Sequence, residues 1–473
     1  MIKQLRRTFL FLTPLFFLLL FRHNPSIVGK ELYPLLPMPS VSEMKRIMVF
    51  APHPDDETLA CGGLIAEARR KGIPVTVVVV TNGESFSYAA HIHYKKVNLP
   101  PSYYIKFGEK RQEETLSAME LLGVPKEDVL FLGYPDSDLY QLWEKYWDYN
   151  ELYTHFLLHT SFSPFTRIYH KNAPYCGMAL IDDLKEILLK YKPTDIFIPS
   201  AEDAHPTHWA VNCFVNIALL ELKEKKGFSP RVFTYVVHRG RFPSPRGLKM
   251  EEMIRPPYPL LGIGLHWRSL PLPQDIVRLK YEAIKRYKSQ LLPRGRVFMF
   301  SFARSNELFA DEKDALPIPR VRKGRIVVDG RDEDWNGIPP FVIDPQKDTL
   351  LKILEPQADI TYVYACQDGE NLYLMLKTAR NISKKVRYYI SILGLEEVGG
   401  KRLRMREEFK PKFTQQCLEC SIPLHMLGNN RSLFLGAMTK YRGFTIDKTA
   451  YRIAILEPLH IAHKGLLKRA NSH

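Results

Sequence analysis

One segment near the start of the chain limits the fold more than any other. An apolar run at 46–50 leads into the sequence His-Pro-Asp-Asp-Glu at 53–57. A strand that delivers a histidine and carboxylates to its own carboxyl end, just before a helix, is how open α/β sheets build their sites. A second polar segment follows the apolar run at 196–199 and contains Asp203, His205 and His208. Both segments offer imidazoles and carboxylates, so the sequence predicts a zinc site of the hydrolytic type at this edge of the sheet.

Apolar runs and amphipathic segments alternate over the first part of the chain. Strands are expected at 46–50, 75–80, 129–133, 196–199 and 232–237, and helices at 59–71, 110–122, 182–191 and 275–290. Continuous apolar runs of this length are typical of strands buried between helices in a parallel sheet. The alternation predicts a Rossmann-like, doubly wound, mostly parallel sheet in a domain at 45–316.

An aromatic insertion at 137–178 interrupts this alternation. Tyrosine, tryptophan and phenylalanine recur throughout it. Flat rings stack on sugar faces and tolerate partial exposure, so the insertion is either a substrate wall or lid, or a small packed subdomain.

The pattern changes after a linker expected at 317–324. Short alternating strands separated by Gly and Asp turns are expected at 326–328, 359–365, 372–376, 386–392 and 433–437. Their spacing predicts a β-sandwich over 325–456, followed by a tail at 457–473.

The first 27 residues have the composition of an export signal. Lys3, Arg6 and Arg7 precede an apolar run at 8–21, which is the order of a signal peptide and is short for a membrane span. Residues 1–27 are therefore expected to be a signal peptide or a membrane anchor, and 28–44 a tether. This predicts an exported protein of the bacterial cell envelope, either anchored or secreted.

The net charge of +16 is unevenly distributed. Residues 239–325 contain 19 Lys and Arg against 8 Asp and Glu. Such a stretch either attracts anionic substrates or an anionic membrane surface, or is simply a solvated face. No nucleic-acid-binding motif accompanies it, so no specific nucleic acid is expected, and no obligate protein partner is inferred.

Six cysteines are too few for a disulfide scaffold. Cys61, Cys176 and Cys213 lie in or near apolar segments and are expected to be buried thiols. Cys417 and Cys420 form a single CxxC pair, which is compatible with a local disulfide in an oxidising compartment.

The motif at 53–57, taken with Asp203, His205, Pro206 and His208, resembles the PIG-L / LmbE-like family of zinc-dependent N-acetylglucosaminyl deacetylases. Further similarity extends over segments at 111–123, 132–136 and 280–290. The resemblance covers about residues 45–290.

The resemblance implies a role for each matched residue. His53, Asp56 and His208 correspond to the metal ligands, and Zn²⁺ is the expected ion, although Fe²⁺ suits the same donors. Asp55 corresponds to the general base that removes a proton from the attacking water. His205 corresponds to the group that stabilises the oxyanion, as an imidazolium.

Other matched positions concern the sugar and the histidines. Arg111 and Asp136 correspond to residues that hold sugar hydroxyls, with a salt bridge as the alternative. The position between the two downstream histidines is commonly acidic in the family and is Thr207 here. Asp203 is expected to take over the orientation of His205. If it does not, His205 is less basic and the pH optimum moves downward.

The turns around 328–335 and 365–373 resemble carbohydrate-binding modules of the family 9 or DOMON-like type. This implies glycan binding, with Ca²⁺ held by turn carboxylates, or a structural appendage. The expected activity is removal of the N-acetyl group from an N-acetylglucosamine-type sugar of a glycan or glycoconjugate. The alternatives are a noncatalytic glycan-binding protein of the envelope and a metal-dependent phosphoesterase, which usually needs two metals.

Overall fold

The computed structural model of the chain describes residues 34–311, 315–398, 401–409 and 417–456. The expected leader at 1–27 and the expected tail at 457–473 lie outside the described residues. The described residues divide into two compact units, the first of residues 34–311 with 347–350 and the second of the described residues between 315 and 456 apart from 347–350. Within the described ranges, no helix combines the length and the apolar composition needed to cross a membrane.

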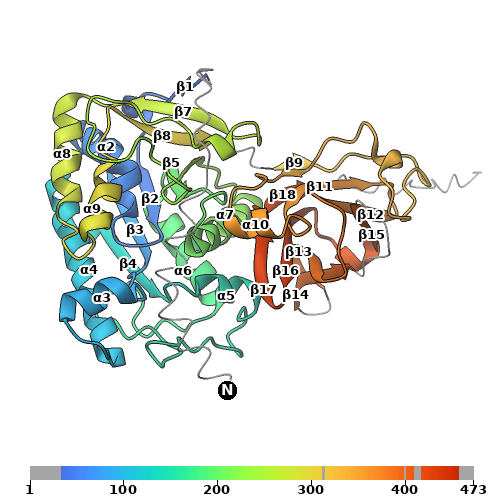
Figure 1. The fold of residues 1–473 in the computed structure, drawn as a ribbon, viewed down its shortest axis with the longest axis horizontal. Helices are drawn as coiled ribbons and strands as arrows, with labels where there is room; N and C mark the ends of the chain where they lie inside the picture. The colour runs from blue at the N-terminus through green and yellow to red at the C-terminus, as the bar shows by residue number, and fades with distance from the viewer. Residues whose placement is uncertain (1–33, 312–314, 399–400, 410–416, 457–473) are drawn as a thin grey trace, which may run out of the picture. The chain divides into compact units, whose positions relative to one another are not determined.

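An eight-stranded sheet forms the centre of the first unit, in the order β1-β7-β8-β6-β5-β2-β3-β4 (Figure 1). Its strands are β1 (Leu36–Pro37), β2 (Ile47–Ala51), β3 (Val75–Thr81), β4 (Val129–Tyr134), β5 (Asp195–Pro199), β6 (Arg231–Tyr235), β7 (His266–Pro271) and β8 (Asn306–Asp311). The five neighbours β6-β5-β2-β3-β4 are parallel, whereas β8 runs antiparallel to β6 and β7.

The order of the parallel strands places a site. The chain moves outward from β2 to β4 and then returns to β5 on the other side of β2. In open α/β sheets, ligands bind beyond the carboxyl ends of the strands where the order reverses in this way. Every residue of β2, β3 and β5 is buried, as expected for strands covered on both faces. The predicted α/β fold with a parallel sheet is confirmed.

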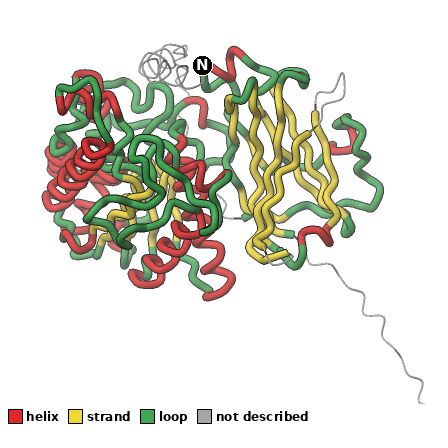
Figure 2. The backbone as a smooth tube through the Cα atoms, turned by 90° about the horizontal axis from the view of Figure 1, so that it is seen from below, coloured by secondary structure: helices red, strands yellow, loops and turns green. Residues whose placement is uncertain are grey.

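Helices cover both faces of this sheet (Figures 1 and 2). They are α2 (Asp56–Arg70), α3 (Ser87–Tyr94), α4 (Pro101–Leu121), α5 (Leu139–Glu144), α6 (Gly177–Tyr191), α7 (Pro206–Lys226), α8 (Gln274–Ile284) and α9 (Pro293–Phe300). Helices α2 and α4 both pack against α8, and helices α5 and α6 both pack against α7. Helix α8 ends at Ile284 and not at residue 290 as expected. In the turns that follow it, the hydroxyl of Tyr287 donates to Glu57 and that of Ser289 donates to Glu114.

The second unit is rich in β-strands and contains two sheets. One has the order β10 (Val342–Ile343), β11 (Ile360–Gln367), β12 (Asn371–Thr378), β15 (Cys417–Pro423). The other has the order β14 (Lys401–Phe409), β13 (Val386–Val398), β16 (Ser432–Tyr441), β18 (Arg452–Ile455), β9 (Leu316–Pro317), and β17 (Phe444–Lys448) pairs with β16. A short helix, α10, spans Leu350–Leu354. Buried side chains of both sheets, among them Leu374 and Ile390, belong to one hydrophobic cluster. The β-rich character is confirmed, and the sandwich arrangement stays a prediction.

One local expectation for this unit is wrong, and one possibility left open by the sequence is not realised. Residues 326–328 form no strand: Val327 and Val328 are exposed, and the Val327 N–H donates to Asp334 Oδ2 at 2.7 Å. Cys417 and Cys420 are free thiols. They lie three residues apart on one strand, so their side chains point to opposite faces and pack in different hydrophobic clusters.

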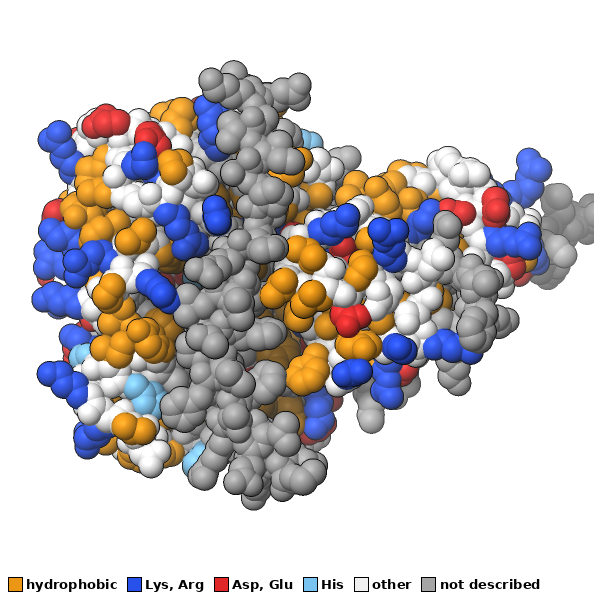
Figure 3. Space-filling view, in the orientation of Figure 1, with side chains coloured by type: hydrophobic (Ala, Val, Ile, Leu, Met, Phe, Trp, Pro, Cys, Tyr) orange, Lys and Arg blue, Asp and Glu red, His pale blue; other side chains and the backbone are white. Residues whose placement is uncertain are grey.

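Basic side chains do not gather in one place on the face shown in Figure 3. Lysine and arginine are scattered there among hydrophobic and neutral side chains. An anionic membrane surface as a partner therefore stays a prediction.

Candidate metal and catalytic site

The turn after β2 holds Asp55 in an unusual backbone conformation. Asp55 is the N-cap of α2 and has a φ of 118°, a region that an L-residue enters at an energetic cost. Glu57 Oε2 accepts the backbone N–H of Asp55 at 3.1 Å, and the hydroxyl of Tyr287 donates to the other oxygen of Glu57. Arg111 donates to the Pro54 carbonyl at 2.6 Å and to Asp55 Oδ2 at 3.3 Å. These contacts fix the backbone of Asp55 and hold its carboxylate against Arg111.

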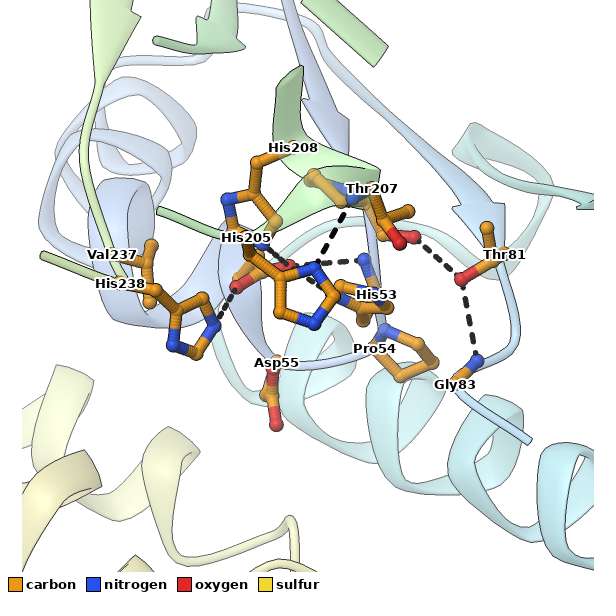
Figure 4. Close-up of polar contacts among 12 residues, drawn as sticks. His53, Pro54, Asp55, Thr81, Gly83, His205, Thr207, His208, Val237 and His238 are labelled. Atoms are coloured by element: carbon orange, nitrogen blue, oxygen red, sulfur yellow. Dashed lines mark hydrogen bonds and ion pairs between the residues drawn. The ribbon is translucent and has the colours of Figure 1, made fainter. Parts of the chain in front are cut away.

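Three predicted ligands come together at the point where the strand order reverses. Figure 4 shows two of them, His53 and His208, with His205. His53 Nδ1 and His208 Nε2 each lie 3.0 Å from Asp56 Oδ2. His53 and Asp56 follow β2, whereas His208 lies in the first turn of α7, which follows β5. All three side chains are buried. Segments about 150 residues apart in the sequence thus place two nitrogens around one carboxylate oxygen.

A carboxylate holds the outer nitrogen of each of these imidazoles. Asp136 Oδ1 lies 3.1 Å from His53 Nε2, and Asp203 Oδ2 lies 3.2 Å from His208 Nδ1. This arrangement is common around metal-binding histidines, because the carboxylate fixes the tautomer and the orientation of the ring. It leaves His53 Nδ1 and His208 Nε2 facing Asp56.

The contacts of Arg111 and Asp136 differ from those that hold sugar hydroxyls. Arg111 is 4% exposed, and it also donates to the Gly83 carbonyl at 2.9 Å. A Cβ atom on Gly83 would lie only 1.8 Å from Arg111 Nη1, so the guanidinium fits closely against the backbone. Asp136 uses both carboxylate oxygens within the protein, since its Oδ2 accepts the Ser85 N–H at 3.0 Å. Arg111 contacts Pro54, Asp55 and Gly83, whereas Asp136 contacts His53 and Ser85. Contact of either residue with a sugar stays a prediction.

His205 lies close to the ring of His53, with ring centroids 4.6 Å apart. Its Nδ1 accepts the backbone N–H of Thr207 at 3.3 Å. The expected carboxylate partner acts elsewhere: Asp203 Oδ1 accepts the backbone N–H of His205 at 2.9 Å, while Oδ2 lies against His208. Asp203 thus fixes the turn that carries both histidines, and it orients the ring of His208.

A further histidine, His238, lies at the site and was not expected from the sequence. It comes three residues after β6, and its Nε2 lies 3.8 Å from Asp56 Oδ1 (Figure 4). The signal that could have revealed it is its place just beyond the carboxyl end of a predicted parallel strand next to β5. Nothing in the local spacing of the sequence joins it to His205 or His208.

Buried charges strongly perturb the pKa values of this site in the metal-free protein. Burial lowers the pKa of His53, but the charge of Asp136 and the contacts with Asp56 outweigh it and raise that pKa to about 9. Asp203 and Asp56 likewise overcome the burial of His208 and raise its pKa to about 10. The same pairs hold the pKa values of Asp56, Asp136 and Asp203 well below the usual range, against the effect of burial.

The remaining polar groups shift in the direction that burial favours. Burial raises the pKa of Asp55 to about 8, although Arg111 opposes the rise. Burial and the neighbouring charges of His53 and His208 hold the pKa of His205 well below its usual value, which favours the neutral imidazole. This differs from the imidazolium implied by the resemblance.

The donor set fits a divalent cation. Asp56 Oδ1 is buried and has no hydrogen-bond partner among the described residues. Without a metal, two protonated imidazoles supply the positive charge that Asp56, Asp136 and Asp203 require. One carboxylate and two imidazoles are also a usual zinc ligand set. A divalent ion would replace those protons and satisfy the free oxygen.

Part of the aromatic insertion packs against α7, the helix that carries His208. Trp143 and Trp147 pack on Phe214 of this helix, with ring centroids 5.2 and 5.9 Å apart. His155 Nε2 lies 3.2 Å from Ser85 Oγ, beside Asp136. These contacts favour a packed subdomain for this part of the insertion. Other rings of the insertion remain exposed, namely those of Tyr149, Phe156 and Phe162.

Comparison with known proteins gives a family match to the first unit. Residues 48–219 match the model of the family described as PIG-L: GlcNAc-PI de-N-acetylase. These residues include each of the predicted site residues but not His238. A curated relative, 1D-myo-inositol 2-acetamido-2-deoxy-alpha-D-glucopyranoside deacetylase of Nocardia farcinica, is 62% identical over 32 residues. That match spans 7% of this chain and 11% of the relative, about a tenth of its length.

Solved structures share low similarity with the chain. N,N'-diacetylchitobiose deacetylase from Pyrococcus horikoshii is 18% identical to this chain with a TM-score of 0.33, and the match covers 54% of this chain and 73% of the deacetylase chain. The zinc-inhibited form of a teicoplanin deacetylase has 18% identity and a TM-score of 0.35, over 56% and 97%. A 4-carboxy-2-hydroxymuconate hydratase from Pseudomonas putida has 16% identity and a TM-score of 0.34, over 55% and 83%. Since deacetylases and a hydratase both occur, these likenesses single out no reaction. What the family match does give is a domain of the PIG-L (GlcNAc-PI de-N-acetylase) family at residues 48–219.

Proposed function

We propose that the protein is a metal-dependent N-deacetylase that removes the acetyl group from an N-acetylglucosamine-type sugar of a glycan or glycoconjugate. One observation carries the proposal: His53 Nδ1 and His208 Nε2 meet at Asp56, and the preceding residue, Asp55, has its carboxylate paired with Arg111. The PIG-L family domain at 48–219 supports it, because the family is described by de-N-acetylation of an N-acetylglucosamine conjugate.

The ligands of the proposed ion are His53, Asp56 and His208. When bound there, Zn²⁺ or Fe²⁺ would act as a Lewis acid toward water and toward the acetyl carbonyl. Asp136 and Asp203 keep the correct nitrogen of each imidazole turned inward. Their role is to position the ligands, and removal of either carboxylate loosens a ring that the ion needs.

Asp55 is the proposed general base. It takes a proton as a water oxygen forms a bond to the carbonyl carbon of the acetyl group. It returns that proton to the sugar nitrogen as the C–N bond breaks, so the products are acetate and an amine. Arg111 and Glu57 hold Asp55 in its strained conformation, which keeps the carboxylate at a fixed distance from the reacting atoms.

His205 is the proposed donor to the oxyanion. Its Nδ1 accepts a hydrogen bond from the backbone of Thr207, so the hydrogen of the neutral ring is on Nε2. This Nε2–H can donate to the carbonyl oxygen as negative charge develops on it. A neutral imidazole performs this step without requiring the missing carboxylate at position 207.

Release of acetate tests the proposal. Purified protein is incubated with N-acetylated chitooligosaccharides and other N-acetylglucosamine glycosides, with a chelator and after Zn²⁺ is restored. Acetate should appear only with the metal. Asp55→Asn should retain zinc and lose most turnover, whereas His208→Ala should lose zinc. His425→Ala, which changes an exposed histidine of the second unit, is the matched control and should retain both.

Full activity and full zinc content in both Asp55→Asn and His208→Ala would refute the assignment. Sugar binding without acetate release by the metal-loaded protein would favour a noncatalytic glycan-binding protein, and release of phosphate without acetate would favour a phosphoesterase.

We also infer export from the composition of residues 1–27, either as an anchored or as a secreted protein of the cell envelope. Fractionation of cells that express the full chain tests this directly.

Glycan binding by the second unit is a further part of the proposal. Binding of Ca²⁺ by its turn carboxylates is not proposed. The turn carboxylates expected to hold Ca²⁺ contact groups of the protein: Asp368 accepts the N–H groups of Glu370 and Asn371, and Asp332 pairs with Lys377.

A further inference from the structure

The ligand set around Asp56 has room for one more donor. Asp56 Oδ1 is buried without a hydrogen-bond partner among the described residues, and His238 Nε2 lies 3.8 Å from it. This separation is too long for a hydrogen bond. It suits two donors of one ion, because ligands at ~2.1 Å from a tetrahedral zinc lie ~3.4 Å apart. Donor atoms of Asp56, His208 and His238 all lie within 4.8 Å of one another.

The backbone of His238 is fixed by the residue that also orients His208. Asp203 Oδ2 accepts the N–H groups of Val237 and His238 at 2.8 and 2.9 Å. The same oxygen lies 3.2 Å from His208 Nδ1. The His238 carbonyl in turn accepts the N–H of Ala204 at 2.7 Å. One carboxylate thus ties the loop after β6 to the turn before α7, as it would if both elements served the same ion.

The ring of His238 is also held in place. It stacks on Phe298 of α9 with centroids 5.4 Å apart and planes inclined by 18°. Its centroid lies 4.9 Å from that of His208 and 5.3 Å from that of His205. With Phe298 stacked on one face of the ring, His238 Nε2 lies on the side of Asp56 Oδ1.

We propose that His238 is a fourth protein ligand of the metal, which gives the ion three imidazoles and one carboxylate. The inference rests on the proposed function, because that proposal supplies the ion. Residue 238 lies outside the region that matches the PIG-L family, so the family match says nothing about this ligand. Catalytic zinc can expand to five ligands, which leaves a place for the substrate carbonyl or for water.

The test counts nitrogen ligands and needs no substrate. The protein is loaded with Cu²⁺, and the number of bound imidazole nitrogens is read from the hyperfine structure of its electron paramagnetic resonance spectrum. Wild type should show three nitrogens, and His238→Ala and His238→Asn should each show two. Zn²⁺ retention against a competing chelator should fall at least about tenfold in both variants. His425→Ala should leave the count at three.

Several results would overturn the inference. One is a count that is the same in His238→Ala as in wild type, with unchanged zinc retention. Another is a count that falls in His205→Ala but not in His238→Ala, because His205 would then be the third imidazole. His238→Asn keeps a polar side chain and guards against misfolding of the alanine variant, and circular dichroism checks the fold of each. If wild type binds neither Cu²⁺ nor Zn²⁺, the proposed function itself fails.

Discussion

Replacement of Arg111 separates a structural role at the site from a role in sugar binding. Arg111→Met removes a buried guanidinium that donates to the carbonyls of Pro54 and Gly83 and to Asp55 Oδ2. Hydrogen bonds from a charged donor contribute ~1.5–3 kcal/mol each, so loss of the two bonds to carbonyls should lower the free energy of unfolding by ~3–6 kcal/mol. Four of the five tryptophans lie in the first unit, so fluorescence during urea unfolding reports mainly on that unit.

Arg111→Met also removes the positive charge beside the carboxylate of Asp55 and thereby changes the pKa of that carboxyl group. At 3.3 Å and an effective dielectric constant of ~20, Arg111 and Asp55 attract by at most ~5 kcal/mol. Arg111 opposes the burial that raises the pKa of Asp55, so its removal raises that pKa further. A base works only when ionised, so the acid limb of the kcat/KM profile should move to higher pH.

A matched variant isolates the charge. Arg111→Lys keeps the positive charge but cannot reach both carbonyls, so it should lose stability while its acid limb stays close to that of wild type. A structural role for Arg111 is refuted if Arg111→Met raises only KM, leaves the acid limb at the pH of wild type and leaves the free energy of unfolding within ~1 kcal/mol of wild type. That outcome is expected if the guanidinium mainly holds sugar hydroxyls.

Three further predictions concern the metal and the loop. Asp203→Ala should weaken zinc binding by about 10–100-fold in a chelator competition, because His208 loses the carboxylate that orients its ring; an unchanged affinity would show that the ring is held by other contacts. Zinc binding near neutral pH should release about two protons, because the pKa values of His53 and His208 in the metal-free protein are about 9 and about 10 and both rings must become neutral to bind. Affinity should therefore rise with pH below these values, and calorimetry in buffers of different ionisation enthalpy that finds no proton release would contradict the assignment. Gly83→Ala should destabilise the fold by at least ~1–3 kcal/mol in thermal or urea unfolding, because its φ is +64° and the new Cβ would meet Arg111 Nη1; a neutral effect would show that the guanidinium can move.

Several strands of the first unit could be predicted from the sequence, because strands buried on both faces consist almost entirely of apolar residues. Strands β2, β3 and β5 are continuous apolar runs, and each lies where it was expected. Strands β7 and β8 were not predicted, because β7 (His266–Pro271) mixes charged and apolar residues and its pairing depends on distant partners. The strand predicted at 326–328 is absent, because β-branched residues favour a strand only where a partner strand is present.

The site was predictable only where its residues share a local pattern. His53, Asp56 and His208 lie in recognisable segments, and the structure brings them together. His238 has no such neighbour in the sequence, and it reaches the site because β6 pairs with β5. The contact of Asp203 with His208, in place of His205, depends on side-chain geometry within one turn, which residue spacing does not determine.

The central claim is that one divalent ion is bound between the turn after β2 and the start of α7. Anomalous X-ray scattering at the zinc absorption edge, from crystals of the metal-loaded protein, tests it most directly. The account predicts one strong peak in the first unit, ~2.0–2.2 Å from His53 Nδ1, from a carboxylate oxygen of Asp56 and from His208 Nε2. A peak at another place, or none at this point in fully loaded protein, would contradict it.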